Sequence, residues 1–318
     1  MIMKIRNIGL VMLLATGLTL TSCNKDDLDS KSIFTDDLES ATNLSDFDKW
    51  LNVNYRDAYN IELKYRYIDN ESDRYYNVIP AEYDKAKALA ILVKHMWLDT
   101  YSEVMGNDFL KTYAPRIIQL TGSYKYQQNE SGESGGVVMG TAEGGIKVML
   151  YGVNSMDIDN PYINIDDPYS SDKWSTTVFD MNHWFFHTMH HEFCHIMTQK
   201  KEYDTEFRAI SAADYHATDW VNVSDVDAAK EGFVTGYASG EYNEDFAEIY
   251  ATYVTMTEAA WQKIIDNAGE EGAAIIEKKL NILRDYFKNS WNLDIDYLRS
   301  VILRRSNEVY SLDLRTLK

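Results

Sequence analysis

The chain has 318 residues, enough for one large domain or two smaller ones with hydrophobic cores. Hydrophobic residues make up 45% and charged residues 25%, close to the average for globular proteins, which argues against a disordered chain, a fibrous repeat or a polytopic membrane protein. The net charge of -19 argues against a nucleic-acid partner, because phosphate binding needs a concentrated positive field.

The first segment of the chain has the pattern of a targeting signal. Two basic residues precede an apolar stretch over residues 8–20, which is too short to span a bilayer comfortably. The sequence Leu-Thr-Ser-Cys at residues 20–23 resembles the lipobox that lipoprotein signal peptidase cleaves. We therefore predict a signal peptide over residues 1–22 and lipidation of Cys23. The alternative is an ordinary secretory signal that ends beside an incidental cysteine.

The residues after Cys23 are polar. Asn-Lys-Asp-Asp at residues 24–27 resembles the short acidic export tag of lipoproteins displayed on the outer face of some Gram-negative outer membranes, which implies an outer-membrane lipoprotein exposed at the cell surface. Residues 23–43 contain few large apolar side chains and are predicted to be a tether. If Cys23 carries lipid, Cys194 has no disulfide partner, so the exported body depends on its core.

Residues 44–180 mix helix and strand patterns. Apolar residues at helical spacing predict two helices, Asp46–Tyr59 and Pro80–Tyr101. Short apolar or alternating runs predict three strands, Ile61–Ile68, Ile117–Leu120 and Ile146–Val153. Gln127–Gly136 is polar and rich in Gly and Ser, so we expect a mobile loop there.

Residues 181–318 are predicted to be mostly helical. A long helix is expected from about Thr176 to Lys200, followed by an irregular stretch to about Phe233. Four more helices are predicted: Asn243–Glu258, Ala260–Asp266, Glu270–Asn289 and Leu293–Ser306. A mixed half followed by a helical half places the chain in the α+β class.

A motif with chemical meaning lies in the predicted long helix. Residues 191–195, His-Glu-Phe-Cys-His, match the pattern HExxH. Residues four apart lie about 40° from each other around a helix and one turn along it, so both imidazoles can reach one zinc ion. Glu192 lies about 100° round from His191, where it can hold a water that zinc has acidified. The motif predicts His191 and His195 as zinc ligands and Glu192 as the general base.

The same helix holds three more histidines, His183, His187 and His190. Only the pair His191 and His195 has a glutamate directly after its first histidine. We therefore predict that the other three face the core or support the ligands. The alternative is a histidine-rich helix that binds no metal.

Two histidines do not complete a zinc site, so a third ligand is needed. A metzincin would place glycine and histidine three and six residues after the motif, where this chain has Thr198 and Lys201, and that class is excluded. His216 matches no spacing that identifies a ligand. Glu244 and Glu248 lie one turn apart on the next predicted helix, so one can bind zinc while the other orients a ligand histidine.

Two questions about this acidic segment stay open from spacing alone. Acidic residues at a helix start are also explained by the helix dipole, without any metal. Asp245 lies about 100° round the helix from Glu244, so only one of the two can point at the metal.

The motif, with Gly236–Gly240 and Asn243–Glu248 after it, resembles the gluzincin metallopeptidases and is similar to the catalytic domain of anthrax lethal factor and its relatives. The resemblance covers residues 191 to about 250. It implies Glu244 as the third zinc ligand and Glu248 as the residue that orients a ligand histidine. It also implies Tyr237 as the hydroxyl that stabilises the oxyanion, the alternative being one more surface tyrosine.

With its lipobox, the whole chain resembles the zinc metallohydrolase lipoproteins associated with substrate import through TonB-dependent importers. The resemblance implies a zincin-like fold: a small mixed sheet, a backing helix over Pro80–Tyr101 and an active-site helix. Ile146–Val153 would form the sheet edge beside the cleft, where a peptide can add as a strand. The implied activity is hydrolysis of peptide bonds in peptide or protein substrates with one Zn²⁺ ion.

One departure from the family pattern and two alternatives to peptide hydrolysis remain open. Cys194 stands where a glycine or another small residue is frequent, and it is either a small core residue or a thiol sensitive to oxidation. A non-catalytic lipoprotein that presents substrate to an importer is disfavoured by Glu192, because structural zinc sites are usually fully ligated by protein. Hydrolysis of a non-peptide amide or ester stays open, because the same activated water serves both reactions.

Overall fold

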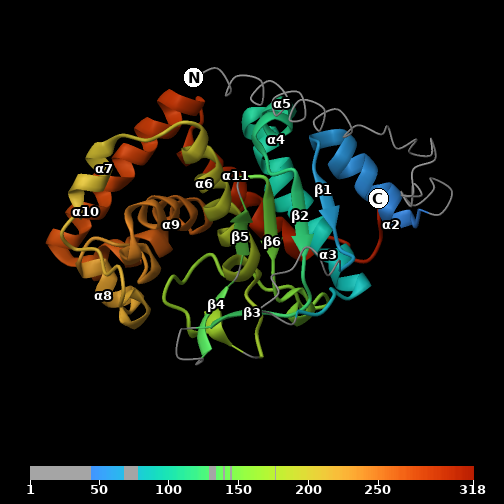
Figure 1. Cartoon of the computed structure of the whole chain (residues 1–318), viewed down its shortest axis with the longest axis horizontal. Coiled ribbons are helices and arrows are strands. Elements are labelled where there is room, and N and C mark those ends of the chain that lie inside the picture. The colour runs from blue at the N-terminus through green and yellow to red at the C-terminus, as the bar shows by residue number, and fades with distance from the viewer. Residues whose placement is uncertain (1–43, 68–77, 129–133, 139, 144, 176) are drawn as a thin grey trace, which may run out of the picture. The chain divides into compact units, whose positions relative to one another are not determined.

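The computed structural model describes residues 44–67, 78–128, 134–138, 140–143, 145–175 and 177–318. The body of the chain, Ser45–Lys318, forms one compact unit (Figure 1). The predicted signal peptide, Cys23 and the predicted tether lie outside the described residues. Among the described helices, none has both the length and the apolarity needed to cross a membrane.

The two helices predicted in the first half are confirmed, and both pass into π-helical turns. The first is α2 (Asp46–Leu51) with η1 (Asn52–Asp57). It begins at a capping box, in which the Ser45 hydroxyl accepts the amide of Asp48 at 3.1 Å and the Asp48 carboxylate accepts the amide of Ser45 at 3.0 Å. The second comprises α3 (Tyr83–Val93), η3 (Lys94–Leu98) and α4 (Asp99–Met105), and α5 (Asn107–Tyr113) follows Gly106, whose φ is 82°.

The three predicted strands are confirmed at shorter lengths, and they form a parallel core. They are β1 (Glu62–Lys64), β2 (Ile117–Leu120) and β6 (Lys147–Leu150). A fourth strand, β5 (Gly140–Glu143), pairs antiparallel with β6, so the sheet order is β1-β2-β6-β5.

The prediction that the strand after Ile146 forms the sheet edge is wrong. In β6, Lys147 pairs with Ile117 of β2 on one side and with Glu143 of β5 on the other. The edge next to the helical half is β5, and among the described residues no further strand pairs with it.

The prediction of a mobile loop over Gln127–Gly136 is wrong in part. β3 (Lys125–Gln128) and β4 (Ser134–Val138) form an antiparallel pair, while residues 129–133 lie outside the described part of the chain. The Gly- and Ser-rich composition predicted no strand, but pairing with a neighbouring strand can override weak intrinsic preference.

The second half is mostly helical, as predicted. The long helix comprises the π-helical η6 (Asn182–His187) and α6 (Thr188–Lys200), so it begins several residues later than expected. The remaining predicted helices correspond to α9 (Tyr242–Thr255), α10 (Glu258–Trp291) and α11 (Ile295–Glu308). Two predicted helices merge in α10, where Gly269 has φ 69° and ψ -173° and interrupts the helical backbone.

The stretch expected to be irregular contains two short helices, α7 (Thr205–Ile210) and α8 (Asp225–Lys230). The side chains of Asp204 and Ser224 cap them by accepting the amides of Glu206 and Asp227. Helices of six residues bury too few side chains to produce a clear apolar period, which explains why the sequence pattern missed them.

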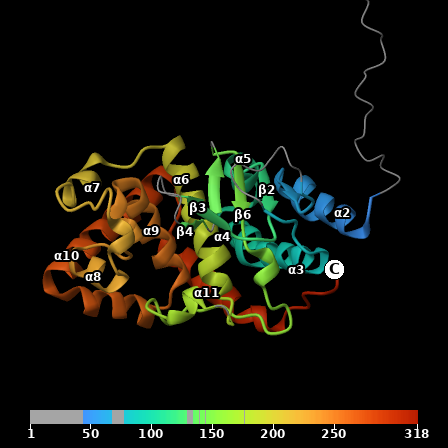
Figure 2. The same cartoon turned by 60° about the horizontal axis from the view of Figure 1, so that its bottom comes forward.

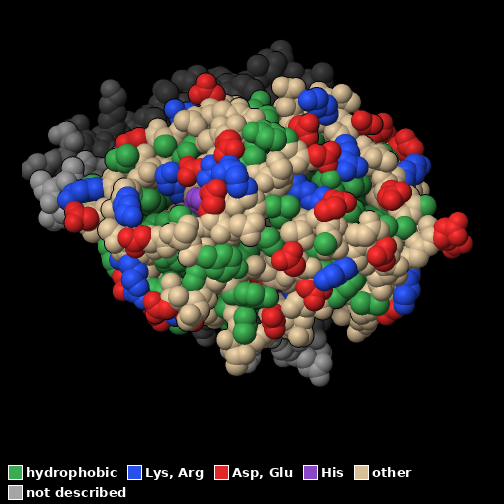
Figure 3. Space-filling model, turned by 180° about the vertical axis from the view of Figure 1, so that it is seen from behind, with side chains coloured by type: hydrophobic (Ala, Val, Ile, Leu, Met, Phe, Trp, Pro, Cys, Tyr) green, Lys and Arg blue, Asp and Glu red, His purple; other side chains and the backbone are tan. Residues whose placement is uncertain are grey.

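The helix α6 lies between the sheet and the helical half, next to β5 and α9 (Figures 1 and 2). Behind it, the ring of Phe193 packs at 5.1 Å from that of Trp97 and 5.0 Å from that of Tyr101. These residues are buried, so the second predicted helix supports α6 from the core side. On the surface, acidic and basic side chains are interspersed with apolar ones on the face in Figure 3.

Candidate metal centre

The helix α6 and the first turn of α9 bring together the three residues predicted to bind zinc. His191 Nε2 and His195 Nε2 lie 3.0 Å apart, and Glu244 Oε2 lies 3.0 Å from the first and 3.3 Å from the second. One donor atom from each residue lies within 4.8 Å of the others. Two imidazole nitrogens and one carboxylate oxygen form a donor set typical of catalytic zinc, which keeps a fourth position open. The residues present therefore fit a zinc ion.

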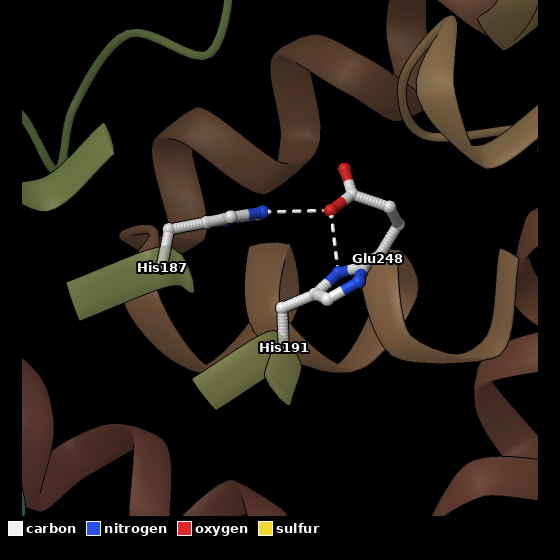
Figure 4. Close-up of side chains that lie close together, drawn as sticks. All are labelled: His187, His191 and Glu248. Carbon is white, nitrogen blue, oxygen red and sulfur yellow. Dashed lines mark hydrogen bonds and ion pairs between the residues drawn. The ribbon is translucent and has the colours of Figure 1, made fainter. Parts of the chain in front are cut away.

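Glu248 lies one turn further along α9, behind this donor set. Its Oε1 accepts hydrogen bonds from His191 Nδ1 at 2.8 Å and His187 Nε2 at 2.9 Å, with both imidazoles pointing at that oxygen in Figure 4. Its Oε2 accepts the hydroxyl of Thr235 at 2.7 Å. A carboxylate that holds Nδ1–H of an imidazole leaves Nε2 free to bind metal. Glu248 thus lies where the sequence predicted an orienting carboxylate.

His187 lies close enough to His191 and Glu248 to form a second potential donor group. The distances of 2.8 and 2.9 Å to one carboxylate oxygen are those of charge-assisted hydrogen bonds. Since His191 Nε2 faces the first donor set, its Nδ1 carries the proton that Glu248 accepts. His187 therefore shares the carboxylate that holds a candidate ligand, and its supporting role stays a prediction.

The other histidines lie away from the donor set. Burial lowers the pKa of His183 and of His190 to about 3, so both rings are neutral at pH 7. The ring of His190 contacts the Tyr101 hydroxyl at 3.0 Å. His216 Nε2 lies 2.8 Å from Glu231 Oε2, at the surface.

The structure separates Glu244 from its neighbour Asp245. Asp245 is fully buried, and its Oδ2 lies 2.7 Å from Lys279 Nζ and accepts the Tyr215 hydroxyl at 2.9 Å. Burial raises the pKa of Asp245 to about 6, although Lys279 opposes the shift. Asp245 points into the core, so Glu244 is the acidic residue at the candidate centre.

The candidate centre has a negative field that favours a cation. Burial alone would lower the pKa of His191, but hydrogen bonds to Glu244 and Glu248 raise it to about 10. Burial would raise the pKa of Glu244, yet its hydrogen bonds to His191 and His195 hold that pKa well below its usual range. Two ionised carboxylates around one imidazole stabilise positive charge at this point.

Tyr237 begins η8 (Tyr237–Gly240), the turn before α9. Its ring centroid lies 5.9 Å from that of His191 and 4.9 Å from that of Trp220, and the side chain is 40% exposed. Burial and the nearby charge of Glu244 raise the pKa of Tyr237 well above its usual value. The hydroxyl therefore stays protonated near the donor set, able to donate a hydrogen bond.

A cavity of about 360 Å³ opens beside the donor set. Its walls include Glu192, His195 and Glu244, together with Arg208 of α7. Glu192, the predicted general base, therefore shares one cavity with two of the predicted ligands.

Cys194 does not take part in the donor set. The thiol is fully buried on the core side of α6, and burial raises its pKa well above its usual value. A protonated, inaccessible thiol favours the interpretation as a small core residue over a redox-sensitive group.

Sequence reasoning missed several residues around the site. Thr235 and Trp220 come from segments between α7 and α9 that no motif marks, and they contact Glu248 and Tyr237 only because the chain returns there. For His187 a signal existed, because residues four apart share a helix face and His187 precedes His191 by four.

A mixed sheet, a histidine-bearing helix and a glutamate from a later helix, α9, are features of a metal-binding hydrolase. Residues 40–296 match the family described as "Putative zinc-binding metallo-peptidase", and since this is more than half of the chain, the protein belongs to that family. The chain is similar to the crystal structure of "a putative zinc-binding metallo-peptidase from Bacteroides caccae ATCC 43185", with 38% sequence identity and a TM-score of 0.66. That similarity covers 86% of this chain and 95% of the other. No curated protein matches the chain.

Proposed function

We propose that the protein is a zinc metallopeptidase of the gluzincin type, with His191, His195 and Glu244 as ligands of one Zn²⁺ ion. The observation that carries the proposal is the convergence of these three donors next to a cavity that contains Glu192. Membership in a zinc-binding metallo-peptidase family supports the same class of activity.

Each residue of the site has a role in peptide hydrolysis. Zinc, when bound, supplies Lewis acidity that polarises the substrate carbonyl and acidifies water. Glu192 takes the proton of the attacking water and passes it to the leaving amine. Tyr237, which keeps its proton, donates a hydrogen bond to the oxyanion of the tetrahedral intermediate. Glu248 holds His191 in one tautomer throughout.

The substrate backbone has a place to bind at β5. This strand is the sheet edge beside α6, and its outer side carries no strand partner among the described residues. We propose that an extended peptide pairs with β5 by strand addition, a mode that grips the backbone with little demand on sequence.

We also propose that Cys23 is lipidated and anchors the protein in the outer membrane, exposed at the cell surface and working with a TonB-dependent importer. The support is the lipobox-like sequence before Cys23 and the acidic tag after it. Peptides released at the surface would be available for import.

The decisive experiment is digestion of a diverse peptide library by the zinc-loaded protein, read by mass spectrometry. We expect Glu192→Gln to keep zinc and lose about a hundredfold or more in turnover, because general acid–base catalysis contributes about that much. We expect Glu244→Ala to lose zinc, measured by metal analysis. Equal zinc loss in both variants would contradict the assigned roles, and zinc-loaded wild type that cuts no peptide would favour a non-peptide substrate or a binding protein.

A further inference from the structure

Arg208 is a basic residue in the wall of the cavity that holds Glu192, His195 and Glu244. It lies on α7, in the segment that the sequence predicted to be irregular, and its side chain is half-buried. The general base and two candidate zinc ligands therefore share one cavity with a permanently charged guanidinium.

Two tyrosine rings hold this guanidinium in place. Arg208 Cζ lies 4.6 Å from the ring centroid of Tyr242 and 5.3 Å from that of Tyr203. Tyr203 is itself fixed, because its hydroxyl donates to Asn243 Oδ1 at 3.0 Å. Tyr242 and Asn243 directly precede Glu244 in α9, so the guanidinium is anchored to the segment that carries a candidate ligand. Stacking on aromatic faces orients an arginine while leaving its edge free to donate hydrogen bonds.

The partners of Arg208 differ from those of the other described arginines. Acidic residues outnumber basic ones by 50 to 31, so carboxylate partners are plentiful. Arg208 nevertheless forms no ion pair with any described residue and its Nε has no hydrogen-bond partner, although the Tyr203 hydroxyl interacts with the guanidinium. Arg116 donates to two backbone carbonyls, and the remaining described arginines lie within 4.0 Å of a carboxylate: Arg56, Arg66, Arg284, Arg299, Arg304, Arg305 and Arg315.

We propose that Arg208 binds a carboxylate of the substrate, so that the protein prefers peptides that carry a negative group near the cleaved bond. The inference rests on the proposed peptidase function. A guanidinium matches a carboxylate with two parallel hydrogen bonds, and such charge-assisted bonds are stronger than neutral ones. The carboxylate is either the peptide C-terminus or an Asp or Glu side chain, since the chemistry is the same.

The same cavity also contains Glu202 and Glu241, which would favour a basic group. Glu241 already accepts a hydrogen bond from the Asn243 amide at 3.3 Å. Glu202 is exposed, where water screens its charge. Arg208, oriented by two rings, is the better organised of the charged groups that remain for a substrate.

The test uses peptides in matched pairs, with C-terminal acid against amide and with internal Glu against Gln. Zinc-loaded wild type, Arg208→Gln, Arg208→Lys and the control Arg56→Gln are compared by the ratio of kcat/KM within each pair. Arg56 is an exposed arginine paired with its neighbour Asp57. Binding of the same peptides to zinc-loaded Glu192→Gln, with and without Arg208→Gln, is measured by fluorescence anisotropy and needs no turnover.

We expect wild type and Arg56→Gln to favour the carboxylate peptide by about tenfold or more, as charge-assisted hydrogen bonds predict. The ratio should fall close to one in Arg208→Gln and to an intermediate value in Arg208→Lys, which keeps the charge but loses the planar fork. If the preference disappears when the peptide C-terminus is amidated, Arg208 binds the C-terminal carboxylate. If it disappears only when the internal Glu is replaced by Gln, Arg208 binds the Glu side chain.

Two results would overturn the inference: a ratio that survives in Arg208→Gln, or no carboxylate preference in wild type. The binding measurement separates this inference from the proposed function. Carboxylate-dependent binding without any cleavage would support Arg208 and contradict peptidase activity. Cleavage of neutral and acidic peptides at equal rates would support peptidase activity and contradict the proposed role of Arg208.

Discussion

Glu248 uses both of its carboxylate oxygens inside the core, and this explains how one residue can organise several others. One oxygen accepts two imidazoles and the other accepts the hydroxyl of Thr235. Burial opposes its ionisation, but the charges and hydrogen bonds of His187 and His191 hold the pKa of Glu248 well below its usual value. An ionised, fully bonded carboxylate fixes the orientation of His191.

We predict that Glu248→Gln weakens zinc binding about 10- to 100-fold, the usual effect of losing the partner of a ligand histidine. The amide oxygen can still accept both imidazoles, but it carries no negative charge to stabilise them, and the amide N–H group takes the place of the oxygen that accepts the Thr235 hydroxyl. Competition with a fluorescent chelator measures the zinc affinity. Thr235→Val is the matched control, because it removes one hydrogen bond to Glu248 and leaves both imidazole contacts; an effect as large as that of Glu248→Gln would contradict the proposed role.

For single residues, the sequence predicted the candidate site where the residues are close together along the chain. Helix geometry relates His191 to His195 and Glu244 to Glu248, so spacing indicated both pairs, and the structure brings the two pairs together. The choice between Glu244 and Asp245 depended on Lys279, which lies far along the chain and packs against Asp245 only in the folded state. Arg208 and Thr235 were missed for the same reason.

At the scale of elements, helices were easier to predict than strands. The helical spacing of apolar residues in α6 and α9 can be recognised within each segment. The strand β5, in contrast, is stabilised by its pairing with β6, which the local sequence does not reveal. The sequence Gly-Thr-Ala-Glu at residues 140–143 has no strong strand signal. The prediction therefore placed the edge of the sheet at β6, one strand inward from the true edge, β5.

The interruption of helix α10 at Gly269 shows how the backbone conformation of one residue affects a whole helix. Gly269 has φ 69° and ψ -173°, a region that residues with a side chain avoid, although a Cβ there would meet no atom within 4 Å. We predict that Gly269→Ala lowers the free energy of unfolding by about 1–3 kcal/mol through backbone strain alone. Urea denaturation measures the change. Substitution of the exposed neighbour, Glu270→Ala, should change it by less than about 0.5 kcal/mol, and equal effects would contradict this explanation.

At the scale of the whole molecule, the balance of buried charge sets how stability depends on pH. Asp180 is buried just before the helix that carries the candidate ligands, and its Oδ1 accepts the amides of Asn164 and Asn182 at 2.9 and 3.0 Å. Burial outweighs these bonds and raises the pKa of Asp180 to about 6. The folded state therefore holds this proton more tightly than the unfolded chain, whose aspartate has a pKa near 3.8.

For a raised pKa, the stabilising contribution is complete below the unfolded value and is lost as the pH rises through the folded value. We predict that wild type loses up to about 3 kcal/mol relative to Asp180→Asn between pH 4 and pH 7, since one pKa unit corresponds to about 1.4 kcal/mol. Urea denaturation of both proteins at several pH values gives the difference, in which other titrations cancel. A constant difference across this range would show that Asp180 does not titrate there.

The location of the molecule is also testable. If Cys23 carries the lipid anchor, Cys23→Ala should move the protein from the membrane fraction to the soluble fraction of cells, while the peptidase body stays folded. Fractionation followed by immunoblotting, together with protease treatment of intact cells, would show both the anchoring and the side of the membrane. Membrane retention of Cys23→Ala from which the signal peptide has been removed would contradict lipidation at this residue.

The short edge strand β5 sets a limit on what such an enzyme could cut. Four residues of antiparallel strand span only about 14 Å, so a guest chain aligns just a few of its own peptide units there. Those units must have unsatisfied backbone groups, which residues inside helices and sheets of a native protein do not offer. If the proposed strand addition to β5 holds, proteolysis would act on linkers, frayed ends and unfolded fragments, and it would spare intact folded proteins.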